Sequence, residues 1–164
     1  MGLTKEELFI ILEQEANTMA EVHEGGCLCG AIRYRTKGNP LRAHVCHCTD
    51  CQRRTGSAFA TIVWFADEDV KITGDTLSVY EHRSDESNRL RRSHFCHRCG
   101  TTVMWTNDHR PGVRILMVGT LDDPNWVKIG MHTWTRSAQH WVAFPQDVPR
   151  FEIGSQGAEI TPST

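Results

Sequence analysis

The sequence predicts a mainly β fold preceded by one additional helix. Two observations indicate this. From Gly25 onward, short segments are either alternately polar and apolar or continuously apolar, and turn-forming residues separate them. Residues 4–20 instead show the periodicity of an amphipathic helix, whose apolar residues near one face are Leu8, Ile11, Leu12 and Met19.

The N-terminal helix is expected to begin at a capping box formed by Thr4 and Glu7. It precedes every cysteine, so residues 1–22 are expected to be a helical extension of a β domain spanning residues 23–152. A homodimer contact and a lid over the domain edge are its two candidate roles. Residues 153–164 are small and polar and are expected to form a flexible tail.

Seven strands are expected in the β domain, and each is short. Turn signals separate them, the clearest being Gly38-Asn39-Pro40, Thr73-Gly74-Asp75, Arg110-Pro111-Gly112 and Asp122-Asp123-Pro124. The expected strands are Ala31–Arg35, Ala58–Phe65, Leu77–Glu81, Arg92–Phe95, Thr102–Trp105, Arg114–Val118 and Lys128–Trp134.

Composition and charge restrict the class of protein. The chain has 164 residues, a formal net charge of -2 and a sequence pI of about 6.5, so it lacks the global positive charge of many nucleic-acid-binding proteins. The apolar run from Leu8 to Leu12 is too short to span a membrane, and no secretory pattern is seen. We therefore expect a cytoplasmic protein, in which clustered cysteines are metal ligands rather than disulfides.

The seven cysteines fall into three clusters with the spacing of metal ligands. Zinc favours four tetrahedral ligands, and a C-x-x-C turn followed by glycine presents two thiolates from one loop. The clusters are Cys27-Leu28-Cys29, then Cys46-His47-Cys48-Thr49-Asp50-Cys51, then Cys96-His97-Arg98-Cys99.

Only one division of these cysteines leaves no orphan pair. Joining the middle cluster to either outer cluster gives five ligands and isolates the other pair. Joining the two outer pairs gives a closed four-cysteine site and leaves Cys46, Cys48 and Cys51 as a three-thiolate set. The sequence therefore predicts two zinc ions per chain, a structural one and one with an open fourth position, the pattern of catalytic zinc.

Two alternatives to this division exist. A histidine could complete the second site and make both zincs structural, and the candidates are His44, His47, His94 and His97. In the other alternative the cysteines are free and bind no metal, which the three dense clusters oppose.

The cysteine order and the residues around it resemble the glutathione-dependent formaldehyde-activating enzyme family, which shares a β-rich fold with the Mss4-like proteins. The resemblance covers about residues 23–152. The matching segments are Gly26-Cys27-Leu28-Cys29-Gly30; Cys46 to Cys51 running into Thr55-Gly56-Ser57-Ala58-Phe59; Phe95-Cys96-His97-Arg98-Cys99-Gly100; Gly119 to Pro124; and His132-Thr133-Trp134 to Trp141.

This resemblance implies a structural zinc on the outer cysteines and a catalytic zinc on Cys46, Cys48 and Cys51. It also implies an enzyme that joins glutathione to formaldehyde, giving S-hydroxymethylglutathione, and that is classed by the reverse reaction as a carbon–sulfur lyase. The main alternative is a non-catalytic zinc module that binds another protein, as other Mss4-like proteins do. An open three-cysteine site favours the enzyme, because a binding module has no need of it.

Basic residues beside the second cluster suggest how such a substrate would be held. Arg53 and Arg54 directly follow Cys51, and arginine pairs well with carboxylates, of which glutathione has two. The alternative is a solvated surface pair. The run containing Arg89, Arg91 and Arg92 is better explained as a charged strand edge.

Overall fold

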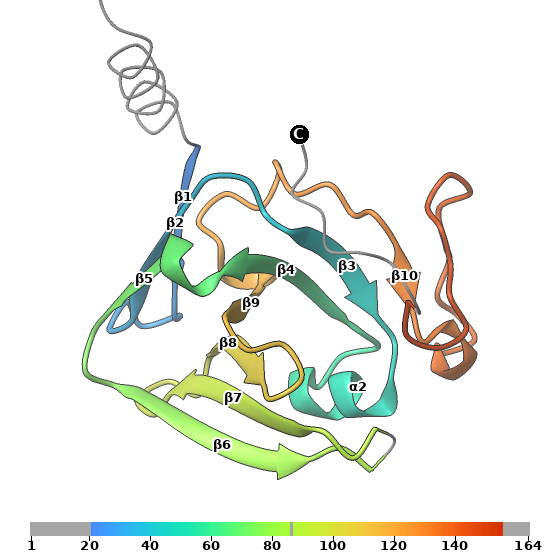
Figure 1. The fold of residues 1–164 in the computed structure, drawn as a ribbon, viewed down its shortest axis with the longest axis horizontal. Helices are drawn as coiled ribbons and strands as arrows, with labels where there is room; N and C mark the ends of the chain where they lie inside the picture. The colour runs from blue at the N-terminus through green and yellow to red at the C-terminus, as the bar shows by residue number, and fades with distance from the viewer. Residues whose placement is uncertain (1–20, 86, 156–164) are drawn as a thin grey trace, which may run out of the picture.

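The computed structural model describes residues 21–85 and 87–155, which form two β-sheets (Figure 1). The smaller sheet has the order β1 (Val22–Gly26), β2 (Arg33–Lys37) and β5 (Val70–Thr73). The larger sheet has the order β10 (His132–Thr133), β3 (Arg42–Cys46), β4 (Ala60–Ala66), β9 (Val113–Met117), β8 (Thr102–Asn107), β7 (Leu90–Cys96) and β6 (Leu77–Arg83). Within these ranges the strand pairs are antiparallel, apart from the parallel pair of β10 and β3.

The mainly β fold class is confirmed, with differences in detail. The expected strands at 77–81, 92–95, 102–105 and 114–118 form β6 to β9. The segment expected as a strand at 128–134 pairs only at His132 and Thr133. Strands β1, β3 and β5 were not expected, and neither was the helix α2 (Thr49–Thr55). The expected helix at 4–20 lies outside the described residues.

The buried residues form two clusters, one shared by the two sheets and one between the larger sheet and α2. One buried cluster contains Ile32, Tyr34, Phe65 and Leu116, each at most 3% exposed. A second cluster is built around the middle cysteines, with Trp105 packed among them. The protein therefore has an ordinary apolar core, and one set of cysteines forms part of it.

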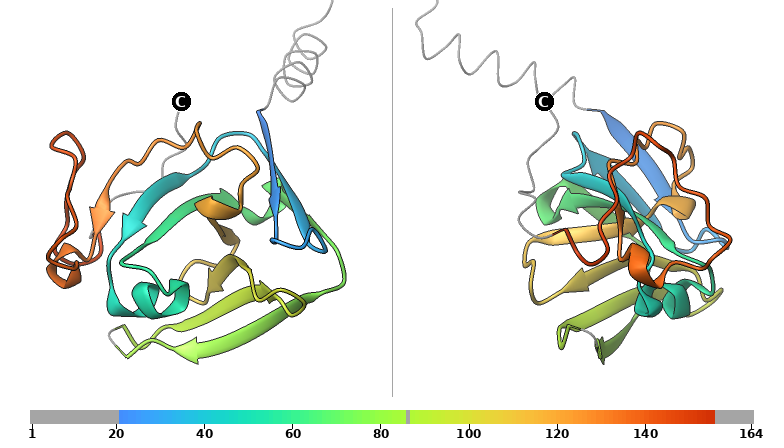
Figure 2. Two further views of the ribbon diagram at one scale, coloured as in Figure 1. Left: turned by 180° about the vertical axis from the view of Figure 1, so that it is seen from behind. Right: turned by 90° about the vertical axis from the view of Figure 1, so that its right-hand side faces the viewer.

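Helix α2 is short, and its capping groups define both of its ends. At the N-terminus of the helix, the Cys48 side chain accepts a hydrogen bond from the backbone N–H of Cys51. Gly56, with φ of 62°, ends the helix. Acidic Asp50 in the first turn and basic Arg53 and Arg54 in the last turn complement the helix dipole. The helix lies between the end of β3 and β7 (Figures 1 and 2).

The segment between β9 and β10 and the segment after β10 are mostly irregular. They contain the 3-10 turns η2 (Val118–Thr120) and η3 (Thr135–Ser137), while η1 (Asp67–Asp69) joins β4 to β5. No helix in the described ranges is both long and apolar enough to span a membrane.

Candidate metal centres

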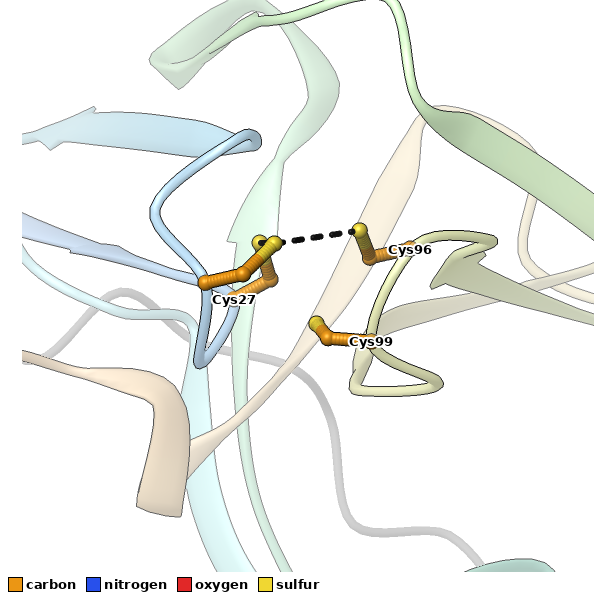
Figure 3. Close-up of side chains that lie close together, drawn as sticks. Cys27, Cys96 and Cys99 are labelled. Atoms are coloured by element: carbon orange, nitrogen blue, oxygen red, sulfur yellow. Dashed lines mark hydrogen bonds between the residues drawn. The ribbon is translucent and has the colours of Figure 1, made fainter.

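The outer cysteines meet in one four-sulfur cluster, which we call the first centre. Cys27 and Cys29 lie on the turn after β1, Cys96 ends β7, and Cys99 lies on the turn that follows. Figure 3 shows the sulfur atoms of Cys27, Cys96 and Cys99 facing one another across the two turns. All four sulfurs lie within 4.8 Å of one another, so segments far apart in the sequence converge on one point.

The sulfur spacing of the first centre fits a tetrahedral metal ion. The Sγ atoms of Cys27 and Cys29 are 3.5 Å apart, and those of Cys29 and Cys96 are 3.8 Å apart. Four thiolates at about 2.3 Å from a zinc ion would be separated by roughly 3.8 Å. The donor set therefore matches zinc in both number and separation.

Each turn of the first centre has the same local design. The Gly30 N–H donates to the Cys27 carbonyl at 3.0 Å, and the Gly100 N–H donates to the Cys96 carbonyl at 2.7 Å. Both glycines have positive φ, 75° and 77°, a conformation that residues with a side chain rarely adopt. A glycine after each cysteine pair thus lets the chain fold back and present both sulfurs.

Hydrogen-bond donors contact sulfur atoms of the first centre. The Ile32 N–H donates to the Cys27 sulfur at 3.2 Å. Hydrogen bonds from the Thr101 hydroxyl and backbone lower the pKa of Cys99 to about 5. Thr101 also accepts the Leu28 N–H at 3.2 Å, which joins the two turns directly. Thiolates are the form in which cysteine binds a metal.

The middle cysteines form a second centre with three sulfurs within 4.8 Å of one another. Cys46 ends β3, Cys48 caps α2, and Cys51 lies in its first turn. They are only 7%, 3% and 2% exposed. The second centre is thus local in sequence and buried, whereas the first joins distant segments.

Charge is unevenly shared among the three buried thiols. The pKa of Cys46 lies well below its usual value, because the thiols of Cys48 and Cys51 hydrogen-bond to it, as does the Thr133 hydroxyl. The pKa values of Cys48 and Cys51 are raised by their hydrogen bonds to Cys46 and by burial. The group alone favours one thiolate, so a cation is needed for all three to ionise together.

No histidine of the described residues completes the second centre: the group within 4.8 Å contains the three cysteines only. His47 instead pairs through Nε2 with His132 Nδ1 at 3.0 Å. His44 is buried, which lowers its pKa to about 3. His94 and His97 contact hydroxyl groups on neighbouring strands. Within the described part of the chain, this group therefore offers three sulfur donors to a metal ion.

Arg54 is fixed beside the second centre. Its Nε and Nη2 atoms donate to the Ser93 hydroxyl at 3.0 and 2.6 Å, and its guanidinium lies 3.9 Å from the ring centroid of Trp105. Trp105 in turn packs in the cluster of the three cysteines. Burial lowers the pKa of Arg54 to about 10, while Asp50 and Cys51 act in the opposite direction. Arg54 remains a cation at neutral pH and is held close to the thiols.

Arg53 is placed differently. It is exposed, and no hydrogen bond or ion pair of its side chain occurs within the described ranges. Two residues along a helix correspond to a rotation of about 200°, so Arg53 and the buried Cys51 lie on opposite sides of α2. Arg53 also lines two cavities, of about 610 and 590 Å³.

Two further partners of α2 were missed by sequence reasoning. Asp50 Oδ1 lies 2.8 Å from His82 Nε2, and its Oδ2 lies 3.3 Å from Arg91 Nε. These partners come from β6 and β7, more than 30 residues away in sequence. No local pattern could have revealed them. Arg91, expected to be only a strand-edge charge, instead fixes the helix that carries Cys51.

A family model and a curated relative point to one family. A family model described as "Glutathione-dependent formaldehyde-activating enzyme" matches residues 22–137. A Halomonas elongata protein with that description as its provisional name is 30% identical over 90 residues, covering 53% of this chain and 57% of the relative. The match thus spans little more than half of that relative. A crystal structure of a Rhodobacter sphaeroides protein has a TM-score of 0.49 and 19% identity, covering 77% of this chain and 98% of that one.

Proposed function

The chain belongs to the glutathione-dependent formaldehyde-activating enzyme family, and from this premise we propose that it joins glutathione to formaldehyde at the second centre. The product is S-hydroxymethylglutathione. The observation that carries the proposal is a buried set of three cysteines without a fourth protein ligand among the described residues. Three protein ligands and one open position are typical of catalytic zinc.

We propose that both centres hold zinc, giving two ions per chain. Cys27, Cys29, Cys96 and Cys99 would hold the structural ion, and Cys46, Cys48 and Cys51 the catalytic one. When bound at the second centre, zinc would lower the pKa of a coordinated thiol and so supply a thiolate near neutral pH.

The overall reaction requires the transfer of one proton. A bond forms between the glutathione sulfur and the formaldehyde carbon, the carbonyl π bond opens, and the proton lost by the thiol ends on the oxygen. In the reverse direction a carbon–sulfur bond is broken, which is why we place the enzyme among carbon–sulfur lyases.

Residues of this chain would support the charge that develops. Arg54 is a fixed cation close to Cys51 and would favour a substrate thiolate electrostatically. Ile62, Trp105 and Ile115 surround the three cysteines with apolar groups. Such surroundings exclude water and strengthen the interaction of Arg54 with a thiolate.

The substrates are small molecules, and we propose that both arginines of α2, Arg53 and Arg54, help to bind glutathione. We also propose the cytosol as the compartment, because clustered free cysteines suit a reducing environment.

A formaldehyde-consumption assay tests the proposal. Protein titrated with zinc should accelerate formaldehyde loss in the presence of glutathione, above the spontaneous reaction measured without protein. S-methylglutathione, which has no titratable thiol, should give no acceleration. The proposed reaction would be refuted if S-methylglutathione accelerated formaldehyde loss as much as glutathione does, or if glutathione gave no acceleration.

A further inference from the structure

A cavity of about 610 Å³ lies beside α2 and contains none of the cysteines. Arg53 and Arg54 line it from the helix. His82 and Arg83 line it from the end of β6, opposite the helix. The volume suits a small molecule rather than a single water. Since α2 carries Cys51, the cavity and the second centre share one element.

The lining of this cavity contains more arginines than carboxylates. Its lining contains Arg53, Arg54 and Arg83 against the carboxylates of Asp50 and Asp85. Asp50 is already paired with two partners outside α2. One acid is therefore neutralised by the protein itself, and the cavity favours an anion.

Two of the three arginines have guanidinium N–H groups that can donate to a ligand. Arg54 already donates to Ser93 through two nitrogens. Arg53 has no partner among the described residues, and Arg83 uses Nη1 for the Asn88 carbonyl at 2.8 Å. A guanidinium has five N–H donors in a planar fork, so Arg83 keeps donors for a carboxylate.

We propose that this cavity binds a carboxylate of the thiol substrate through Arg53 and Arg83. The identity of that substrate rests on the proposed function. Glutathione has two carboxylates, one on its γ-glutamyl residue and one on its glycine, and the cavity chemistry is the same for both. Arg54 links the cavity to the second centre, because it lines the cavity and lies over Trp105, which packs among the three cysteines.

Binding of S-methylglutathione, measured by calorimetry on the zinc-loaded protein, tests the cavity without requiring a reactive thiol. Arg53→Gln and Arg83→Gln should each weaken binding at least about tenfold, the scale of one charge-assisted hydrogen bond. Arg35→Gln is the matched control, because Arg35 is an exposed arginine on β2 of the smaller sheet. It makes the same charge change and should leave the affinity unaltered. Thermal melts verify that all variants are folded.

Two analogues identify the carboxylate. S-methylglutathione amidated at the glycine and S-methylglutathione amidated at the γ-glutamyl α-carboxylate are titrated against wild type and Arg53→Gln. The analogue that binds both proteins equally has lost the group that Arg53 holds. Equal affinity of S-methylglutathione for all four proteins, equal weakening in Arg35→Gln, or no binding to wild type would overturn the cavity proposal.

The same samples separate this proposal from the proposed function. If formaldehyde loss depends on glutathione but the binding of S-methylglutathione is unchanged in Arg53→Gln, the cavity proposal is refuted and the proposed reaction stands. Arginine-dependent binding without any acceleration of formaldehyde loss would refute the reaction and keep the cavity.

Discussion

Cys99→Ser is expected to give an insoluble or unfolded protein. The first centre ties the turn after β1 to the turn after β7, closing a loop of about 70 residues that the chain must otherwise order unaided. Structural zinc contributes about 10–16 kcal/mol of apparent binding energy in small zinc domains. The whole free energy of unfolding of a domain is about 5–15 kcal/mol. Removal of one ligand can therefore abolish folding.

Soluble yield and thermal melting measure this effect, and Cys51→Ser is the matched control. Both variants exchange one buried or partly buried sulfur for oxygen in a candidate metal centre. Cys51 belongs to a centre contained within six consecutive residues, so its loss should leave a folded protein. Equal losses of stability in the two variants would contradict the division into a structural and a catalytic centre.

Cys51→Ser should instead abolish the glutathione-dependent consumption of formaldehyde. Replacing residues that merely orient metal ligands typically costs about 10- to 100-fold in affinity or activity, and removing a ligand should cost more. We expect a fall in kcat/KM of more than about 100-fold, with one zinc per chain retained. The fall reflects the loss of the position at which the thiol would bind.

Elemental analysis and the formaldehyde assay on the same sample test this prediction. Arg35→Gln, an exposed position on β2 that belongs to neither cysteine group, should keep two zinc ions and full activity. If Cys51→Ser lost one zinc but retained wild-type activity, the chemistry would have to occur elsewhere in the protein.

Much of the larger sheet could be predicted from the sequence because its strands are short apolar or alternating segments between clear turns. β1 was missed because its sequence, Val22–Gly26, ends in two glycines. β3 was missed because Arg42–Cys46 contains a histidine at a buried position. Helix α2 has only one buried residue, Cys51, and so has no apolar periodicity to detect.

The strand expected at 128–134 shows the converse error. Its apolar residues suggested continuous pairing, yet only two residues pair with β3. Trp134 directly after them has φ of 58°, a left-handed conformation that ends the strand. A backbone turn of this kind is decided by tertiary contacts, such as the Trp134 N–H donating to the Ile153 carbonyl.

The two candidate centres could be predicted more fully than their surroundings. Metal ligands come in fixed numbers, so counting cysteines was enough to propose the four-plus-three division that the structure brings together. No comparable counting rule predicts the cavity beside α2. Its opposite walls, at Arg53 and at His82, meet only because β6 pairs with β7 and the helix packs beside them.

Cobalt substitution tests whether the second centre has an open fourth coordination position. Cobalt absorption depends on the number and type of ligands, and a coordinated thiol loses its proton. Adding glutathione to the cobalt form should change the spectrum and release protons, while S-methylglutathione should release none. An unchanged spectrum, with no protons released by any thiol, would show that the fourth position is closed.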